Sequence, residues 1–192
     1  DASDIDRIVS TDENHGGNDL ILTGAGSDII IGGEDGEIVS DVEISGVITQ
    51  ARQVTGATTD GDVIHAGNGD NLVLGDNGRI ISAKVDGARF ENIAITLGLV
   101  ESGDSLIGGA DHITTGIGSD IIIGGIDGDI IVANDTETAT QQDGNNIIIG
   151  DSGLIDWTSR DREPSALGGD TDASDIDRIW SKDENHGGSD LI

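Results

Sequence analysis

The feature that most constrains this chain is a nine-residue period near its start. Residues 23–31 read TGAGSDIII, and the segments on either side share a Gly-rich first half, an acid at position six and an aliphatic run behind it. Gly supplies the positive φ angles that a tight turn needs, and β-branched Ile and Val favour strands. Each motif therefore predicts a turn followed by a three-residue strand. The position-six acids are nine residues apart, at Asp19, Asp28 and Glu37.

Repetition of a turn and a short strand predicts an all-β fold: a parallel β-solenoid (β-roll or β-helix) with inserted strand-like segments. The pattern leaves open whether each coil has two sides or three. Successive coils would stack about 4.8 Å apart, as neighbouring strands do, and would bring the position-six carboxylates together. Because carboxylates at that spacing repel, we expect a cation between them, and an all-oxygen environment suits Ca²⁺.

The same nine-residue phase returns later in the chain. Position six is then occupied by Asp62, Asn71, Asp111, Asp120, Asp129 and Asn146. The predicted organisation is the end of an insert at 1–13, a calcium nonapeptide block at 14–40, an insert at 41–56, a GDNG-type block at 57–81, an insert at 82–105, a second calcium block at 106–132, an insert at 133–140, a second GDNG-type block at 141–155, an insert at 156–184 and the start of the next repeat at 185–192.

A much longer repeat overlies the short one. Residues 1–21 read DASDIDRIVSTDENHGGNDLI, and residues 172–192 read DASDIDRIWSKDENHGGSDLI. The two copies differ only at Val9/Trp180, Thr11/Lys182 and Asn18/Ser189, which sets a period of 171 residues. We interpret the chain as one repeat plus overlap from a longer tandem array, whose units stack as a quasi-one-dimensional rod.

The nonapeptide resembles the G-G-x-G-x-D-x-U-x repeat of the RTX (hemolysin-type calcium-binding) family, with Thr23 replacing the first Gly in residues 23–31. The resemblance implies Ca²⁺ held by turn residues, secretion by bacteria, usually through a type I system, and folding outside the cell, as in giant RTX-like adhesins. It also implies two motifs per coil, so that Asp19 would face the turn that carries Asp35 and Glu37. The predicted metal ligands are Asp19, Asp28, Asp35, Glu37, Asp62, Asp70, Asn71, Asp111, Asp120, Asp127, Asp129, Asp143, Asn146 and Asp190. The alternative is that these Asp and Asn side chains only form turns, by accepting hydrogen bonds from the backbone.

The charge balance narrows the function classes. The chain has 38 acidic and 9 basic residues and a net charge of −29, so it repels its own compact state unless cations bind. It lacks the basic patches that nucleic-acid binding needs, and it has no apolar run long enough to span a membrane. No G-x-S-x-G, Cys nucleophile or G-x-x-x-x-G-K motif is present, so we predict that the protein is not an enzyme.

Two groups of residues suggest contacts beyond the short repeat. Positions seven and nine are often aliphatic, as at Ile29/Ile31 and Ile121/Ile123, and would form an apolar stripe that points away from the solenoid core. Either the inserts fold over this stripe, or a second solenoid packs beside it and gives lateral association. Around the start of the next repeat, the sequence places Trp157, Arg160, Arg162 and Trp180, which form either an inter-repeat contact or a solvated turn.

We therefore expect a calcium-binding structural repeat of a long secreted bacterial protein: a stiff extracellular rod, filament or adhesin stalk whose folding Ca²⁺ drives. Its partners would be Ca²⁺ and further copies of the chain. The alternative is an adhesive module that binds a surface glycan or a partner protein through the inserts. At 18 residues per coil, one repeat would add at most roughly 45 Å of length.

Overall fold

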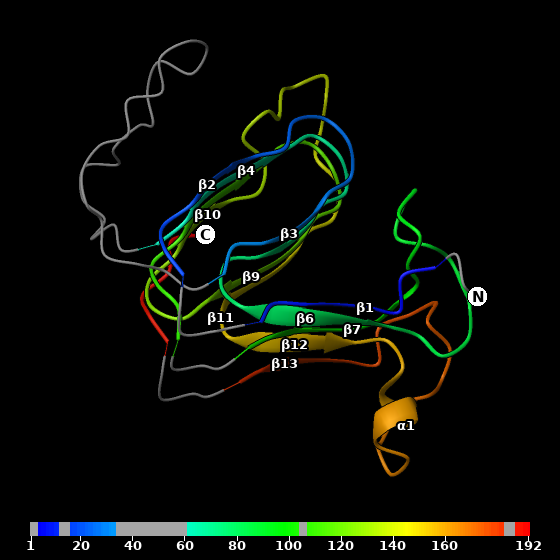
Figure 1. Ribbon diagram of the computed structural model, residues 1–192. Coiled ribbons are helices and arrows are strands. Elements are labelled where there is room, and N and C mark those ends of the chain that lie inside the picture. The colour runs from blue at the N-terminus through cyan, green and yellow to red at the C-terminus, as the bar shows by residue number, and fades with distance from the viewer. Residues whose placement is uncertain (1–3, 12–15, 34–60, 104–106, 183–186) are drawn as a thin grey trace.

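The computed structural model describes residues 4–11, 16–33, 61–103, 107–182 and 187–192, and its regular structure is almost entirely β (Figure 1). These residues form thirteen strands and one short helix, α1 (Ser159–Arg162). The strands form three sheets, two of them parallel and one antiparallel.

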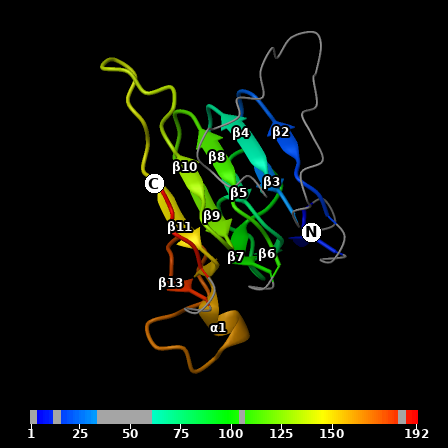
Figure 2. The ribbon, with the colours of Figure 1, turned by 90° about the vertical axis from the view of Figure 1, so that its left-hand side faces the viewer.

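The two parallel sheets have four strands each and lie face to face (Figure 2). All eight of their strands contain the strand half of a nonapeptide, so the predicted phase is confirmed in this part of the chain. The outer parallel sheet has the order β10 (Ile130–Val132), β8 (His112–Thr115), β4 (Val63–Gly67), β2 (Leu20–Leu22). The middle parallel sheet has the order β11 (Ile147–Asp151), β9 (Ile121–Gly125), β5 (Leu72–Leu74), β3 (Ile29–Ile31).

The third sheet is antiparallel, and it corrects the predicted fold. Its order is β1 (Arg7–Val9), β6 (Gly78–Ser82), β7 (Leu97–Ser102), β12 (Gly153–Asp156), β13 (Arg178–Ser181). The all-β composition is as predicted, but the parallel β-solenoid is wrong, because a coil that always turns in one sense gives only parallel neighbours. The segments predicted as inserts supply β1, β7 and β13 of this sheet.

The path of the chain explains the antiparallel pairing. Strands β1, β2 and β3 run from the antiparallel sheet to the outer and then the middle sheet, whereas β4, β5 and β6 begin in the outer sheet and end in the antiparallel one. Strands β7 to β9 repeat the first order, and β10 to β12 repeat the second. Strands β6 and β7 are thus consecutive in one sheet and run in opposite directions. The described residues between 4 and 156 therefore form four layers, with one strand of each sheet in every layer.

Two apolar cores hold the three sheets together. Between the outer and middle sheets lie the central residues of the nonapeptide strands, among them Ile64, Ile113 and Ile122, each fully buried. Between the middle and antiparallel sheets lie the position-seven and position-nine residues of the middle-sheet strands, which pack against the strands that the inserts supply. The first alternative for the apolar stripe is therefore confirmed: strands from the inserts cover it. The members of this second core include Leu72, Leu74, Ile80, Val100, Ile123, Ile155 and Trp157.

This second core makes a direct prediction for Ile123, which is 1% exposed. Replacing Ile123 with Val removes one buried methylene group and is expected to lower the free energy of unfolding by about 1 kcal/mol. Chemical denaturation measures the change. The control is Ile192→Val, at a residue that is 66% exposed, and it should leave stability unchanged. Equal effects of the two substitutions would contradict the burial of the stripe.

Candidate functional site

The acids at position six of the outer sheet form a continuous ladder along its edge. In each layer, the backbone N–H of one aspartate donates to the carboxylate Oδ1 of the aspartate in the next layer. The distances are 2.6 Å from Asp19 to Asp62, 2.7 Å from Asp62 to Asp111, 2.8 Å from Asp111 to Asp129 and 3.0 Å from Asp129 to Asp190. We call these five residues the aspartate ladder. They satisfy backbone donors that the turn leaves outside the sheet pairing.

The middle sheet has a second ladder, in which two of the four members are acids. Its members are Asp28, Asn71, Asp120 and Asn146, and the N–H···Oδ1 distances between successive members are 3.1, 2.8 and 2.8 Å. We call it the mixed ladder, because acids alternate with amides. The Asn71 amide group also donates to the Gly69 carbonyl at 2.8 Å. An amide oxygen therefore fills the same place as a carboxylate oxygen.

The three inner members of the aspartate ladder, Asp62, Asp111 and Asp129, are buried. Burial, joined by the nearby carboxylates of Asp76, Asp190 and Asp151, raises the pKa of Asp129 to about 8, against the lowering effect of the hydrogen bond from the Asp111 N–H. Burial also raises the pKa of Asp190 and, in the mixed ladder, the pKa of Asp120. A ladder with every acid ionised is therefore costly, and protons or cations stabilise it.

Glycines make room for the second oxygen of each ladder aspartate. A Cβ atom added at Gly124 would overlap with Asp129 Oδ2 and with the carbonyl oxygen of Gly150. Corresponding overlaps occur between Gly75 and Asp111, and between Gly150 and Asp190. The Gly at the start of a nonapeptide is thus required here by the neighbouring carboxylate rather than by its own backbone angle.

The other predicted ligands have separate surroundings where the structure describes them. Asp35 and Glu37 fall within 34–60, outside the described residues. Asp70 accepts the N–H of Ser119 at 2.8 Å and lies beside Glu91, whose pKa it raises through a side-chain hydrogen bond and its charge. Asp143 accepts the N–H of Gly118 at 2.9 Å. Asp127 is exposed, with a positive φ of 62°.

A calcium ion takes six to eight oxygen ligands. In the described residues, no three or more His, Asp or Glu side chains are grouped so that they could hold a metal ion. The oxygens most suited to a cation are Oδ2 of Asp28 and of Asp129, which are buried and accept no hydrogen bond from the described part of the chain. The side chains of the described residues do not by themselves supply the shell, and turn carbonyls would have to complete it.

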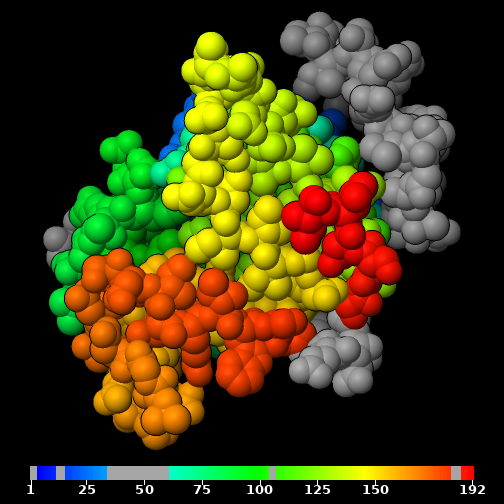
Figure 3. All heavy atoms as spheres, turned by 180° about the vertical axis from the view of Figure 1, so that it is seen from behind, coloured from blue at the N-terminus to red at the C-terminus, as the bar shows by residue number. Residues whose placement is uncertain are grey.

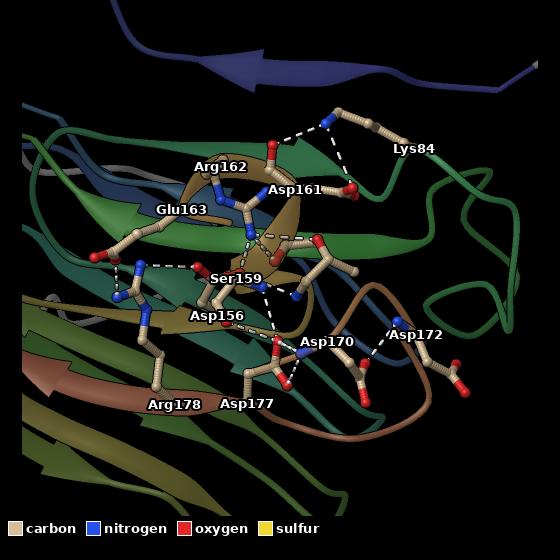
Figure 4. A network of polar contacts seen from close by, with 12 residues as sticks. Lys84, Asp156, Ser159, Asp161, Arg162, Glu163, Asp170, Asp172, Asp177 and Arg178 are labelled. Carbon is tan, nitrogen blue, oxygen red and sulfur yellow. Dashed lines mark hydrogen bonds and ion pairs between the residues drawn. The ribbon is translucent and has the colours of Figure 1, made fainter. Parts of the chain in front are cut away.

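Sequence reasoning named Arg162 but missed its partner Asp156 and the residues Asp177 and Arg178, which form a polar site where the second copy of the 21-residue segment begins (Figure 4). Asp156 is fully buried at the end of β12, and its two carboxylate oxygens contact different arginines. Arg162 of α1 contacts Oδ1, and Arg178 of β13 lies 3.2 Å from Oδ2 and 3.0 Å from Glu163. Burial and the neighbouring Arg178 lower the pKa of Arg162. The available signal was that Arg178 repeats Arg7.

The same site binds the residue before Arg178. The Asp177 carboxylate accepts the N–H and the hydroxyl of Ser159, at 2.8 and 3.0 Å, and the N–H of Asp170 at 3.1 Å. Ser159 is fully buried. We call residues 156–170 together with 177–178 the repeat junction. The polar contacts of Arg162, to Asp156, Thr158 and the Gly98 carbonyl, lie within the first copy. The side chains that join the two copies here are Asp177 and Arg178. The predicted candidates Arg160 and Trp180 are exposed.

The copied segment occupies the next free place in two sheets. Strand β13 is the copy of β1, and these two strands form opposite edges of the antiparallel sheet. Leu191 copies Leu20 and bridges Ile130 in parallel at the β10 edge of the outer sheet, opposite β2. Figure 3 shows residues 187–192 in red at the surface of the molecule. The end of one repeat thus accepts the start of another.

Comparisons with known proteins identify no relative: no family model, no curated protein and no solved structure matches the chain. In the part of the chain that the structure describes, no helix has the length and apolar character needed to cross a membrane.

Proposed function

We propose that this chain is a structural repeat that stacks end to end with further copies of itself, so that all three sheets continue from one repeat into the next. The observation that carries the proposal is the position of β13 and Leu191. Strand β13 is the copy of β1, and Leu191 is the copy of Leu20 in β2; β1 and β2 lie at the opposite edges of their sheets. Both copies lie one layer beyond the last strand that the first repeat contributes to the sheet.

The layer count fixes the length that one repeat adds. Four layers at the ordinary strand spacing of about 4.8 Å give roughly 19 Å per repeat. This value replaces the sequence-based upper bound of roughly 45 Å, because each layer contains three strands and their connections. The array is a thick rod of short rise rather than a thin filament.

Small-angle scattering tests the stacking. Two proteins are compared: the present chain, and a chain in which residues 1–171 occur twice before 172–192. We expect the second protein to be longer by about 19 Å, with an unchanged cross-section. A doubled cross-section, or two units joined by a flexible link, would show that the repeats do not stack.

The calcium dependence and the extracellular bacterial setting belong to the same proposal and rest mainly on the resemblance to RTX repeats. Two observations favour a cation: the net charge of −29, and the buried Oδ2 atoms of Asp28 and Asp129. The insert 82–105 is less suited to the alternative of an adhesive module, because its described part supplies β7 and the buried Ile95 and Leu97 to the core.

Circular dichroism of residues 1–192 tests the calcium part. We expect a cooperative gain of β structure as Ca²⁺ is raised from an EDTA-treated sample to several millimolar, the range of weak extracellular sites. Mg²⁺ at the same concentrations is the control and should not reproduce the gain. A β spectrum that is already complete in EDTA would remove calcium from the proposal and leave the stacking proposal intact.

A further inference from the structure

The repeat junction contains two cations on one buried carboxylate, and only one of them belongs to the first copy. Asp156 is fully buried, accepts the N–H of Thr158 at 3.0 Å and contacts Arg162 from its own α1. The second cation, Arg178, comes from the copied segment. If Arg178 is absent, part of the negative charge of the buried Asp156 carboxylate has no partner, which is energetically costly. The junction is therefore more stable when an arginine occupies this position.

Asp177 makes the recognition two-sided. Its carboxylate is held by Ser159 and Asp170, while the adjacent Arg178 is held by Asp156 and Glu163. Backbone pairing of β13 with β12 fixes the register, and the N–H of Lys182 donates to the Ser152 carbonyl at 2.7 Å. The β12 edge therefore binds an acidic residue followed by an arginine at one fixed position.

The first copy carries the same pair at the other end of the molecule. Asp6 and Arg7 repeat Asp177 and Arg178, and both are exposed. Strand β1 pairs with β6 in the same register in which β13 pairs with β12: Ile8 lies opposite Ile80, and Ile179 lies opposite Ile155. A second molecule therefore presents the required groups on a strand that already has the required conformation.

Exposed apolar side chains gather at the same two ends. Ile179 and Ile192 are 50% and 66% exposed, whereas the residues at the equivalent positions inside the stack, Val100 and Ile113, are fully buried. At the opposite end, Leu20 and Leu22 of β2 are exposed. Stacking of a second copy would give Ile179 and Ile192 the buried environment of these internal counterparts, and would bring Leu20 and Leu22 to the half-buried state of Val63 and His65, which pair with them.

We propose that the repeat junction is a strand-docking site for the first residues of a second copy of this chain, with Arg7 of that copy entering the buried Asp156 carboxylate. This inference rests on the proposed stacking function and names the contact that selects the partner. In the present chain, residues 172–182 occupy the site from within.

A peptide-binding experiment tests the proposal on the full chain. The double variant Asp177→Asn/Arg178→Met removes both held side chains and weakens the internal occupant, while Asp6→Asn/Arg7→Met makes the identical change at the other copy and is the control. The probe is a labelled peptide of residues 1–13. By fluorescence anisotropy, we expect it to bind the first variant at least about tenfold more tightly than the control variant or the unmodified chain. A peptide carrying Arg7→Met should lose at least about tenfold of that affinity.

Equal binding to all three chains, or equal binding of the peptide with and without Arg7→Met, would overturn the proposal.

Hydrogen exchange of the unmodified chain gives a second measure that does not depend on variant folding. Amides of β13 should exchange at least about tenfold more slowly than the matching amides of β1, since both are edge strands and only β13 is held at the junction. Equal protection would count against it. If the two-repeat chain lengthens as expected but these tests fail, the stacking function stands and the arginine-specific docking falls. If that chain does not lengthen, the stacking function itself falls.

Discussion

Raising the pH from about 4 to about 8 is expected to lower the free energy of unfolding on the order of 5 kcal/mol, because Asp129 has its pKa raised to about 8 in the folded state. The folded chain retains a proton at Asp129 that the unfolded chain releases near pH 4. The folded state is therefore favoured at low pH, and the advantage is lost as the pH rises through the folded pKa. The raised pKa values of Asp120 and Asp190 act in the same direction. Chemical denaturation at fixed ionic strength across this range gives the measurement.

The substitution Asp129→Asn should remove most of this pH dependence and stabilise the chain at pH 8. The mixed ladder shows that an amide fits the geometry, since Asn71 Oδ1 accepts the Asp28 N–H at 3.1 Å. Asp86→Asn makes the same change of charge at an exposed residue and is the control. If the two variants have the same pH dependence, the effect reflects total charge and not the aspartate ladder. A gain in stability of the unmodified chain on adding Ca²⁺ at pH 8 that Asp129→Asn abolishes would connect the ladder to cation binding.

Replacing Gly124 with Ala is expected to lower the free energy of unfolding by about 3 kcal/mol or more, because a Cβ there overlaps with Asp129 Oδ2 and the Gly150 carbonyl oxygen. Neither atom moves without breaking contacts between layers. Asp129 Oδ1 holds the N–H of Asp111 at 2.8 Å, and Gly150 is part of β11, which pairs with β9. The loss of stability therefore comes from both side-chain and backbone contacts between layers.

Gly17→Ala is the matched control for this prediction. Gly17 is also in the Gly-rich half of a nonapeptide, yet a Cβ there meets no atom of the described residues within 4 Å. Thermal or chemical denaturation of the two variants should give a large effect for Gly124 and a small one for Gly17. A similar cost at both positions would mean that glycine is needed for backbone freedom, and that the ladder carboxylates do not require it.

The nonapeptide phase predicts the strands of the parallel sheets because its signal is local: a turn, an acid and three aliphatic residues recur together. Asp19, Asp62 and Asp111 come side by side for the same reason, since strands in phase bring equivalent positions into register. The phase also predicts the apolar stripe that the second core uses. The strands, the alignment of the aspartates and the apolar stripe all follow from the local pattern, with no information from residues distant in sequence.

The antiparallel sheet could not be predicted in the same way. Strands β1, β7 and β13 come from segments without the nonapeptide, and β6 and β12 follow the turns at Asp76 and Ser152, which read as the ends of blocks. Their partners lie far away in sequence: Asp156 meets Arg178 only after a helix and a loop have intervened. Reading position-six acids as metal ligands also hid their contact with backbone amides, because a carboxylate suits either role.

The aspartate ladder has a mechanical consequence. Its N–H···O bonds join one layer to the next, as do the backbone bonds of all three sheets, so all of them lie along the stacking direction. Tension applied along an array of such repeats would load the bonds of each layer together, and no layer could separate until bonds at three sheets and two ladders failed at once. A shear force across the array would instead act on the flat apolar cores between the sheets. An array that stacks in this way would resist pulling along its length more strongly than shear across it.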